Sequence, residues 1–262
     1  MKLSEWLANS STSQSEFARQ LGVTQGRISQ IVAGEQPSLD LAMKIAGLTN
    51  NQVRPQDFKD IAMTKTLDTV EEAIKAMADG QLVVVVDDDD RENEGDLIGA
   101  AAKISPEQMA LMVRHTSGIV CTPMPAEEAR RLKLDPMVAL NDAPMGTAFT
   151  VTIDYKVGLT TGISAKERCA TVHALANKNV QAEDFVRPGH IFPLVAKSGG
   201  VLMRSGHTEA AVDLARLAGF TPAVGVISEL VNDDGTVKRG PQVLAFAREH
   251  GLKIISAAPS RY

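Results

Sequence analysis

Residues 82–96 read LVVVVDDDDRENEGD, and this segment changes from purely apolar to strongly acidic at Asp87. The short, β-branched run 82–86 predicts a buried strand. Seven carboxylates follow within residues 87–96. Their mutual repulsion is unfavourable, so their clustering does not serve the stability of the fold. A hard divalent cation relieves such repulsion, and Arg91 adds a fixed positive charge suited to a carbonyl or phosphate group. The segment therefore predicts a metal or substrate site at a strand end, with a solvated acidic loop as the alternative.

The chain around this segment, residues 66–262, alternates strand-like and helix-like stretches. Mixed elements in a block of about 200 residues predict one mixed α/β domain. Further strands are expected at 119–123, 149–155, 191–196, 224–230 and 253–256, and helices at 68–80, 106–114, 126–132, 165–177, 208–218 and 241–250.

Residues 1–60 carry no net charge, because they contain six basic and six acidic side chains, whereas the whole chain is acidic. Ser13 or Ser15 is expected to cap a first helix and Thr24 a second. Gly22 between them suits a left-handed turn. Two helices joined by a short glycine-containing turn predict a helix-turn-helix domain. The predicted domain boundaries are 1–60 for this all-α domain and 66–262 for the mixed domain.

The whole chain has 262 residues, a formal charge of −5 and 4% aromatic residues. These values argue against a protein that coats nucleic acid by bulk charge and against an aromatic platform for single strands. The longest apolar run ahead of the acidic segment, 82–86, is far shorter than the ~20 residues that span a bilayer, so no membrane insertion is expected. Cys121 and Cys169 belong to no CxxC or Cys/His cluster, which favours reduced thiols in the cytoplasm.

A second candidate site is the run Arg204-Ser205-Gly206-His207-Thr208. Thr208 is expected to cap the helix that follows. The N–H groups and the dipole of a helix start, together with a guanidinium group, suit a bound phosphate. His207 can bind a metal or carry a proton. An ordinary capped helix with a surface histidine is the alternative.

Two further residues are candidates for proton transfer. His190 lies between Pro188 and Pro193, which fix the backbone ahead of a predicted strand. Glu229 lies in the apolar run 225–231, where a carboxylate is costly to bury unless it is paired or bound to a cation. The alternatives are a structural histidine and an edge strand whose glutamate faces water.

Together these segments resemble the 3,4-dihydroxy-2-butanone 4-phosphate synthase family, over about residues 66–258. Members convert ribulose 5-phosphate into 3,4-dihydroxy-2-butanone 4-phosphate and formate in riboflavin biosynthesis. The motifs that carry the resemblance are DDDDRENEGD (87–96), RHTSGIVC (114–121), FTVTID (149–154), TTGISA (160–165), RPGHIFPL (187–194), RSGHTEA (204–210) and Ser-Glu-Leu (228–230).

The resemblance implies an α+β domain, a homodimer and a requirement for Mg²⁺ or Mn²⁺. It implies that Glu92 and His207 are metal ligands and that His190 and Glu229 are essential to catalysis. Ser205 departs from the glycine of some relatives, and a positive φ there would strain the loop. The implied substrate-binding residues are Arg91, Glu92, Asp96, Arg204, Ser205, Gly206, His207, Thr208 and Glu229, with Cys121 and the pair Thr160-Thr161 at the border of the site.

The string FARQLGVTQGRISQ at 17–30 resembles the helix-turn-helix of Cro-like phage repressors and related antitoxin-type regulators. This second resemblance covers about residues 1–58 and implies that the second helix enters the major groove of DNA. Glutamine suits adenine and arginine suits guanine. A helical dimerisation or docking module that does not touch DNA is the alternative. The candidate DNA-binding residues are Thr24, Gln25, Arg27, Ser29 and Gln30.

The sequence therefore predicts a cytoplasmic, metal-dependent lyase of riboflavin biosynthesis whose N-terminal domain can bind DNA. The alternative function is a transcription regulator that has kept a synthase-like domain as a metabolite sensor and has lost catalysis. Glu92, His190, His207 and Glu229 are all present, which favours the enzyme.

Overall fold

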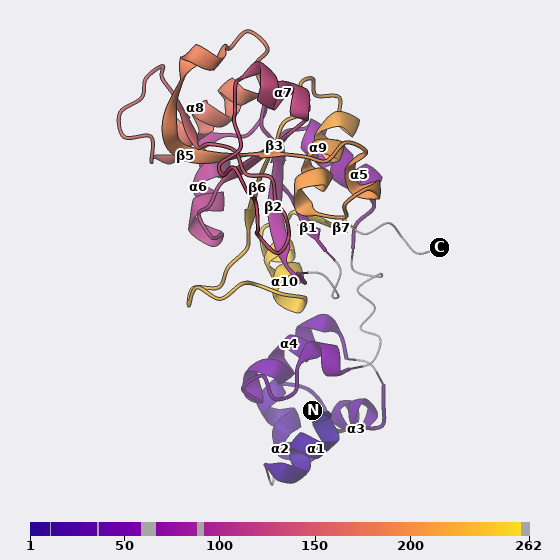
Figure 1. Cartoon of the computed structure of the whole chain (residues 1–262). Coiled ribbons are helices and arrows are strands. Elements are labelled where there is room, and N and C mark those ends of the chain that lie inside the picture. Colours follow the sequence, from indigo (N-terminus) through magenta and orange to yellow (C-terminus); the bar gives the residue numbers. More distant parts are fainter. Residues whose placement is uncertain (11, 36, 59–66, 88–91, 258–262) are drawn as a thin grey trace. The chain divides into compact units, whose positions relative to one another are not determined.

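A computed structural model of the chain describes residues 1–10, 12–35, 37–58, 67–87 and 92–257 (Figure 1). The chain divides into two compact units, Met1–Thr66 and Leu67–Tyr262. Among the described residues, no helix combines the length and the apolar character that a membrane span requires.

Short helices build the first unit. Ser13 and Thr24 accept hydrogen bonds from N–H groups in the first turns of their helices, so each caps a helix as predicted. Gly22 ends the earlier helix with a φ of +70°, a conformation that glycine adopts without strain. Phe17 and Ile28 are fully buried in the core of this unit. The elements are α1 (Leu3–Asn9), α2 (Gln14–Leu21), α3 (Gln25–Val32), α4 (Leu39–Leu48) and the 3-10 helix η1 (Pro55–Asp57).

A seven-stranded sheet forms the centre of the second unit, in the order β4-β5-β3-β6-β2-β1-β7 (Figure 1). The pairs β1–β7 and β3–β5 are parallel, whereas β1–β2, β2–β6, β3–β6 and β4–β5 are antiparallel. This mixed sheet has the predicted α+β character. The strands are β1 (Val83–Val86), β2 (Gly95–Ala100), β3 (Cys121–Met124), β4 (Ile153–Tyr155), β5 (Phe185–Val195), β6 (Gly225–Glu229) and β7 (Lys253–Ser256).

Helices pack against this sheet, and α5 and α9 share one large core with it. Val83, Val85, Ile98 and Ile227 contribute to that core, and each is at most 5% exposed. Burying a side chain of this kind stabilises the fold by ~1.5–3 kcal/mol. The helices are α5 (Val70–Ala78), α6 (Pro106–His115), α7 (Ala126–Arg131), α8 (Ala165–Leu175), α9 (His207–Leu217) and α10 (Pro241–Glu249), with 3-10 turns η3 (Ala182–Asp184) and η4 (Gly200–Leu202).

Three of the differences from the sequence predictions concern elements that carry site residues. Strand β2 is absent from the predicted strands, because its first residues close the acidic segment, yet all six of its positions are buried between β1 and β6. Strand β5 begins at Phe185, so His190 lies within a strand and not ahead of one. The prediction that Thr208 caps α9 is wrong, since the N-cap is Gly206 and Thr208 lies buried in the first turn.

Candidate active site

The described end of the acidic segment, from Glu92 onward, is hydrogen-bonded to Asp87. The Asp87 carboxylate, directly after β1, accepts hydrogen bonds from the N–H groups of Glu92 (3.2 Å) and Glu94 (2.9 Å). The Asp87 N–H in turn donates to the Glu94 carbonyl at 3.3 Å. Asp87 therefore holds the backbone of Glu92 and Glu94 close to the end of β1. Arg91, predicted to bind substrate, lies outside the described residues.

Three side chains meet at the end of β1. Ligand atoms of Asp87, Glu92 and His207 all lie within 4.8 Å of one another. His207, the first residue of α9, places its Nδ1 3.9 Å from Glu92 Oε2 and 3.5 Å from Asp96 Oδ1. The two residues predicted as metal ligands are thus neighbours in space. Asp87 is an additional candidate, and its sequence signal is its place as the first carboxylate after the strand.

Asp96 brings a buried negative charge to the same place. It is 1% exposed, and within the described parts of the chain its Oδ1 receives no hydrogen bond. Burial raises the pKa of Asp96 well above its ordinary value, and the charges of Glu229 and Glu92 raise it further. Hard oxygen donors, one imidazole and an excess of negative charge together fit a divalent cation.

Glu229 joins this group through the sheet. It ends β6 and is the direct cross-strand partner of Asp96 on β2. Its Oε2 accepts a hydrogen bond from Ser117 Oγ at 2.7 Å, and its carbonyl accepts one from the Ser117 N–H at 2.8 Å. Ser117 is an orienting residue that the sequence reasoning missed, although it lies in a quoted motif.

Cys121 borders this group as a buried thiol. It is 3% exposed on β3 and pairs with Ile227 of β6. Burial strongly raises the pKa of its thiol, and the charges of Glu229 and Asp96 act in the same direction. Both effects disfavour the thiolate, the form in which a cysteine acts as a nucleophile.

Arg204 is already oriented by the fold. Its Nη1 lies 2.7 Å from Glu209 Oε2, and its Nη2 donates to Thr147 Oγ1 at 3.3 Å. Glu209 is 1% exposed and also accepts the Lys197 N–H at 3.0 Å. One edge of the guanidinium group is thus held by a buried carboxylate.

The loop after Arg204 reaches α9 without backbone strain at Ser205. That residue is not among those with positive φ in the described part of the chain. Its hydroxyl donates to the Val201 carbonyl at 3.3 Å. The Gly206 N–H donates to the Arg204 carbonyl at 2.8 Å and is therefore engaged within the loop.

His190 lies in a second group with Asp154. Its Nδ1 is 2.7 Å from Asp154 Oδ2, and its N–H donates to Asp154 Oδ1 at 2.9 Å. Asp154 ends the FTVTID motif and is 3% exposed, but the sequence reasoning gave it no role. Nearby, the Glu167 carboxylate accepts hydrogen bonds from the N–H groups of Thr160 (2.6 Å) and Gly162 (3.2 Å) and so shapes the predicted border loop.

Arg168 connects the two groups. This buried side chain donates from Nη1 to the Gly118 carbonyl at 3.1 Å, one residue beyond Ser117. Its Nε donates to the Ile163 carbonyl at 3.0 Å, in the loop that packs on Asp154 and His190.

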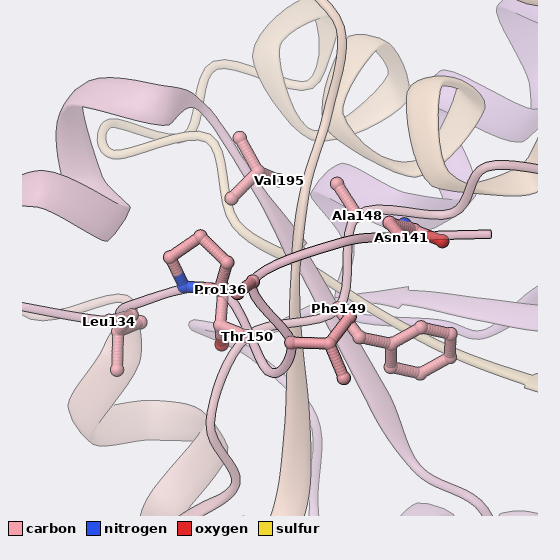
Figure 2. A pocket seen from close by; sticks show the side chains of 9 residues that line it. Leu134, Pro136, Asn141, Ala148, Phe149, Thr150 and Val195 are labelled. Carbon is pink, nitrogen blue, oxygen red and sulfur yellow. The ribbon is translucent and has the colours of Figure 1, made fainter. Parts of the chain in front are cut away.

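A cavity of about 500 Å³ has none of the predicted site residues in its lining (Figure 2). Figure 2 shows that Leu134, Pro136, Phe149 and Val195 give it a largely apolar lining, with Asn141 at one side. None of its lining residues is a charged group, so no side chain of the lining supplies a counter-charge for a phosphate.

The candidate DNA-binding residues lie on and before α3. Gln25 Nε2 donates to Gln14 Oε1 of α2 at 3.3 Å, which braces one helix against the other. The Arg27 guanidinium pairs with Glu35 and also contacts Gln30 Oε1 at 3.4 Å. The exposed members of the set are Thr24, Gln25, Ser29 and Gln30, whereas Arg27 is half-buried.

Comparison with known families gives two separate matches, one within each of the two units of the chain. Residues 71–259 match the model of 3,4-dihydroxy-2-butanone 4-phosphate synthase. Residues 3–54 match a helix-turn-helix model.

Curated relatives and solved structures agree with this match. A 3,4-dihydroxy-2-butanone 4-phosphate synthase of Agrobacterium fabrum is 53% identical over 73% of this chain and 89% of its own length. One of Edwardsiella ictaluri is 50% identical over 79% of this chain and 91% of its own length. The chain spans about half (51%) of the Pseudomonas aeruginosa synthase, at 54% identity. A solved synthase described as a complex with two magnesium ions superposes with a TM-score of 0.70 at 46% identity, over 73% of this chain and 94% of that chain.

Proposed function

The chain belongs to the 3,4-dihydroxy-2-butanone 4-phosphate synthase family, and we propose that the group around Glu92, Asp96, His207 and Glu229 is its active site. The enzyme is a lyase of riboflavin biosynthesis that converts ribulose 5-phosphate into 3,4-dihydroxy-2-butanone 4-phosphate and formate. The observation that carries the proposal is the convergence of Glu92 and His207, from distant parts of the sequence, on one buried carboxylate-rich cluster.

The cofactor is a divalent cation, Mg²⁺ or Mn²⁺. Glu92 and His207 would hold it, with Asp87 as a third donor. When bound, such an ion polarises a sugar oxygen and offsets negative charge that develops on the substrate. Asp96, next to this cluster, would orient a substrate hydroxyl group, and Arg91 would contact the substrate from the acidic segment.

The substrate phosphate would bind where Arg204 meets the start of α9. The contacts that support this are the Arg204–Glu209 pair, which fixes the guanidinium group, and the N-terminal turn of an 11-residue helix. Ser205, Gly206 and Thr208 would complete the phosphate loop. Anchoring the phosphate would hold the reacting carbons in place.

The reaction moves protons at several steps, from removal of the C3 proton to release of C4 as formate. Glu229, oriented by Ser117, would exchange protons with the substrate. His190 would be the second proton carrier.

A formate-release assay with ribulose 5-phosphate, run with Mg²⁺ and with EDTA, tests this function. Glu92→Gln and His207→Asn are expected to lower turnover by about 10³-fold or more, because metal stabilisation of developing charge is worth several kcal/mol. Glu183→Gln is the matched control, since Glu183 forms an exposed pair with Lys133. Wild-type turnover by either ligand variant would contradict the assignment. Absence of any formate from the wild-type chain would favour the sensor alternative.

The predicted homodimer is also a proposal. Leu140 and Leu202 are 80% and 82% exposed, and the neighbouring Met203 is 69% exposed. Large apolar side chains left in water at this level are typical of a surface that a partner covers. Light scattering is expected to give twice the chain mass of 28.0 kDa. A mass equal to one chain would contradict the dimer.

DNA binding by the first unit is a second proposed function. The exposed Gln25, Ser29 and Gln30 on α3 support it, because they lie on the helix that a helix-turn-helix places in the major groove. Fluorescence anisotropy with DNA from the chain's own promoter tests it. A specific complex that Gln25→Ala weakens is expected, and equal affinity for unrelated DNA would contradict it.

A cytoplasmic location is a further proposal, which the two free, buried cysteines support.

A further inference from the structure

The Asp154 carboxylate makes two hydrogen bonds to one residue. Its Oδ2 lies 2.7 Å from His190 Nδ1, and its Oδ1 accepts the His190 backbone N–H at 2.9 Å. A carboxylate oxygen only accepts, so the ring nitrogen that faces it must carry the proton. In neutral His190 the lone pair is therefore on Nε2, the nitrogen turned away from Asp154.

Gly162 leaves the space that this pair occupies. A Cβ atom at position 162 would lie 2.1 Å from Asp154 Oδ2 and 2.8 Å from His190 Nδ1. Both distances are far below ordinary contact distances, so any larger residue would push the carboxylate and the imidazole apart. Gly162 also has a φ of +82°, and its own N–H is held by Glu167 at 3.2 Å.

Arg168 supports the buried charge of Asp154. Its guanidinium group is close enough to interact electrostatically with Asp154, and its Nε fixes the carbonyl of Ile163, the residue after Gly162. A positive charge this close to the carboxylate stabilises its negative charge.

We infer that Asp154 is a positioning residue that fixes the tautomer and orientation of His190, and that Gly162 is the residue that makes this pairing possible. The inference rests on the proposed function, because it assigns a task to a histidine that carries protons there. His190 Nε2 is then the atom that exchanges a proton with the substrate. The His190 side chain is 42% exposed, so part of the ring is accessible.

Asp154→Asn tests the inference, because an amide offers one acceptor where the carboxylate offers two. If the amide oxygen keeps the backbone N–H of His190, its NH₂ group faces Nδ1 and favours the opposite tautomer. We expect the ¹⁵N signals of the two His190 ring nitrogens to exchange their protonated and unprotonated character. The kcat is expected to fall by about 10²-fold or more with KM nearly unchanged, since a proton transfer is impaired and substrate binding is not.

The NMR signals of His190 are identified by their loss in His190→Gln, measured on the full chain. An unchanged His190 tautomer in Asp154→Asn would overturn the inference. Full turnover by His190→Gln would instead contradict the catalytic role of His190 in the proposed function. The two failures are thus distinguishable.

Gly162→Ala provides a second test with a close control. Gly158 has a φ of +74° in the same loop, but a Cβ there would meet nothing within 4 Å. Gly158→Ala therefore reproduces the cost of a left-handed alanine without touching the pair. We expect Gly162→Ala to alter the His190 ring signals and lower kcat at least tenfold relative to Gly158→Ala. Equal kcat and equal signals in the two variants would overturn the role of Gly162.

Discussion

Asp96 on β2 and Glu229 on β6 are direct cross-strand partners. Directly opposed residues of an antiparallel pair project from the same face of a sheet, so the register of these two strands alone brings the carboxylates together. Glu92 and Asp87 add to the negative charge around Asp96. The sheet therefore concentrates like charges that only a cation or a proton can relieve.

Asp96→Asn is expected to raise stability in the absence of metal and to reduce the stabilisation that Mg²⁺ provides. In EDTA the variant should be more stable than wild type by about 1–3 kcal/mol, because one buried charge is removed from a repelling group. In Mg²⁺ it should gain less stability than wild type, because the site holds less negative charge. Thermal unfolding under both conditions measures the two effects. Asp184→Asn, which removes a carboxylate outside the cluster around Asp96, is the control. If Asp96→Asn were less stable than wild type in EDTA, the proposed repulsion among these carboxylates would be contradicted.

Arg204→Lys is expected to raise KM roughly tenfold with little change in kcat. Lysine keeps a positive charge near the buried Glu209 but loses the planar fork that can hold a carboxylate and a phosphate at once. Steady-state kinetics with ribulose 5-phosphate measure this split. Arg216→Lys on the exposed side of α9 is the control, since Arg216 pairs only with Asp213 among the described contacts. An unchanged KM would remove Arg204 from the phosphate site.

Asp68→Asn is expected to lower the free energy of unfolding by about 2 kcal/mol at pH 7. Asp68 accepts the Ile254 N–H and a Lys253 Nζ–H, both at 2.9 Å, and so ties the start of the second unit to β7. Although burial raises the pKa of Asp68, these bonds and the charge of Arg248 outweigh it and hold the pKa below its ordinary value.

The sign of the pH dependence follows from that lowered pKa. The contribution of Asp68 is fully present above its unfolded-state pKa of about 4, and it is lost as the pH falls through the lower folded-state pKa. Urea unfolding from pH 7 downward should therefore show a constant gap between wild type and Asp68→Asn that closes only in acid. A gap that closes near neutral pH would show that other groups are responsible.

Glu35→Gln is expected to strengthen DNA binding by the first unit. The Arg27 guanidinium pairs with Glu35. The glutamate therefore competes with DNA for this guanidinium group and adds negative charge beside α3. Neutralising Glu35 should tighten binding several-fold and steepen the dependence of affinity on salt. Anisotropy titrations at two salt concentrations measure both quantities. Glu16→Gln, on α2, is the control for a general charge effect, and an equal gain there would contradict a specific role of Glu35.

Local features of the chain could be predicted because they depend on neighbours in the sequence. The caps Ser13 and Thr24 and the turn at Gly22 follow from hydrogen bonds and backbone angles within a few residues. The α+β fold and the family could be predicted because the seven motifs between residues 87 and 230 occur in one order along the chain. The predicted cap at Thr208 was wrong because the N-cap of α9 is Gly206, two residues earlier in the chain.

The sequence by itself determined which residue types are present and in which motifs: the acidic segment after β1, the Arg204 loop and the helix-turn-helix. Only the tertiary structure decided how they pair. The opposition of Asp96 and Glu229, the hold of Glu209 on Arg204 and the pairing of Asp154 with His190 depend on strand register and on where loops pack. The physical reason is that such contacts join residues distant along the chain, and their distances are set by the packed core and not by any local preference of the sequence.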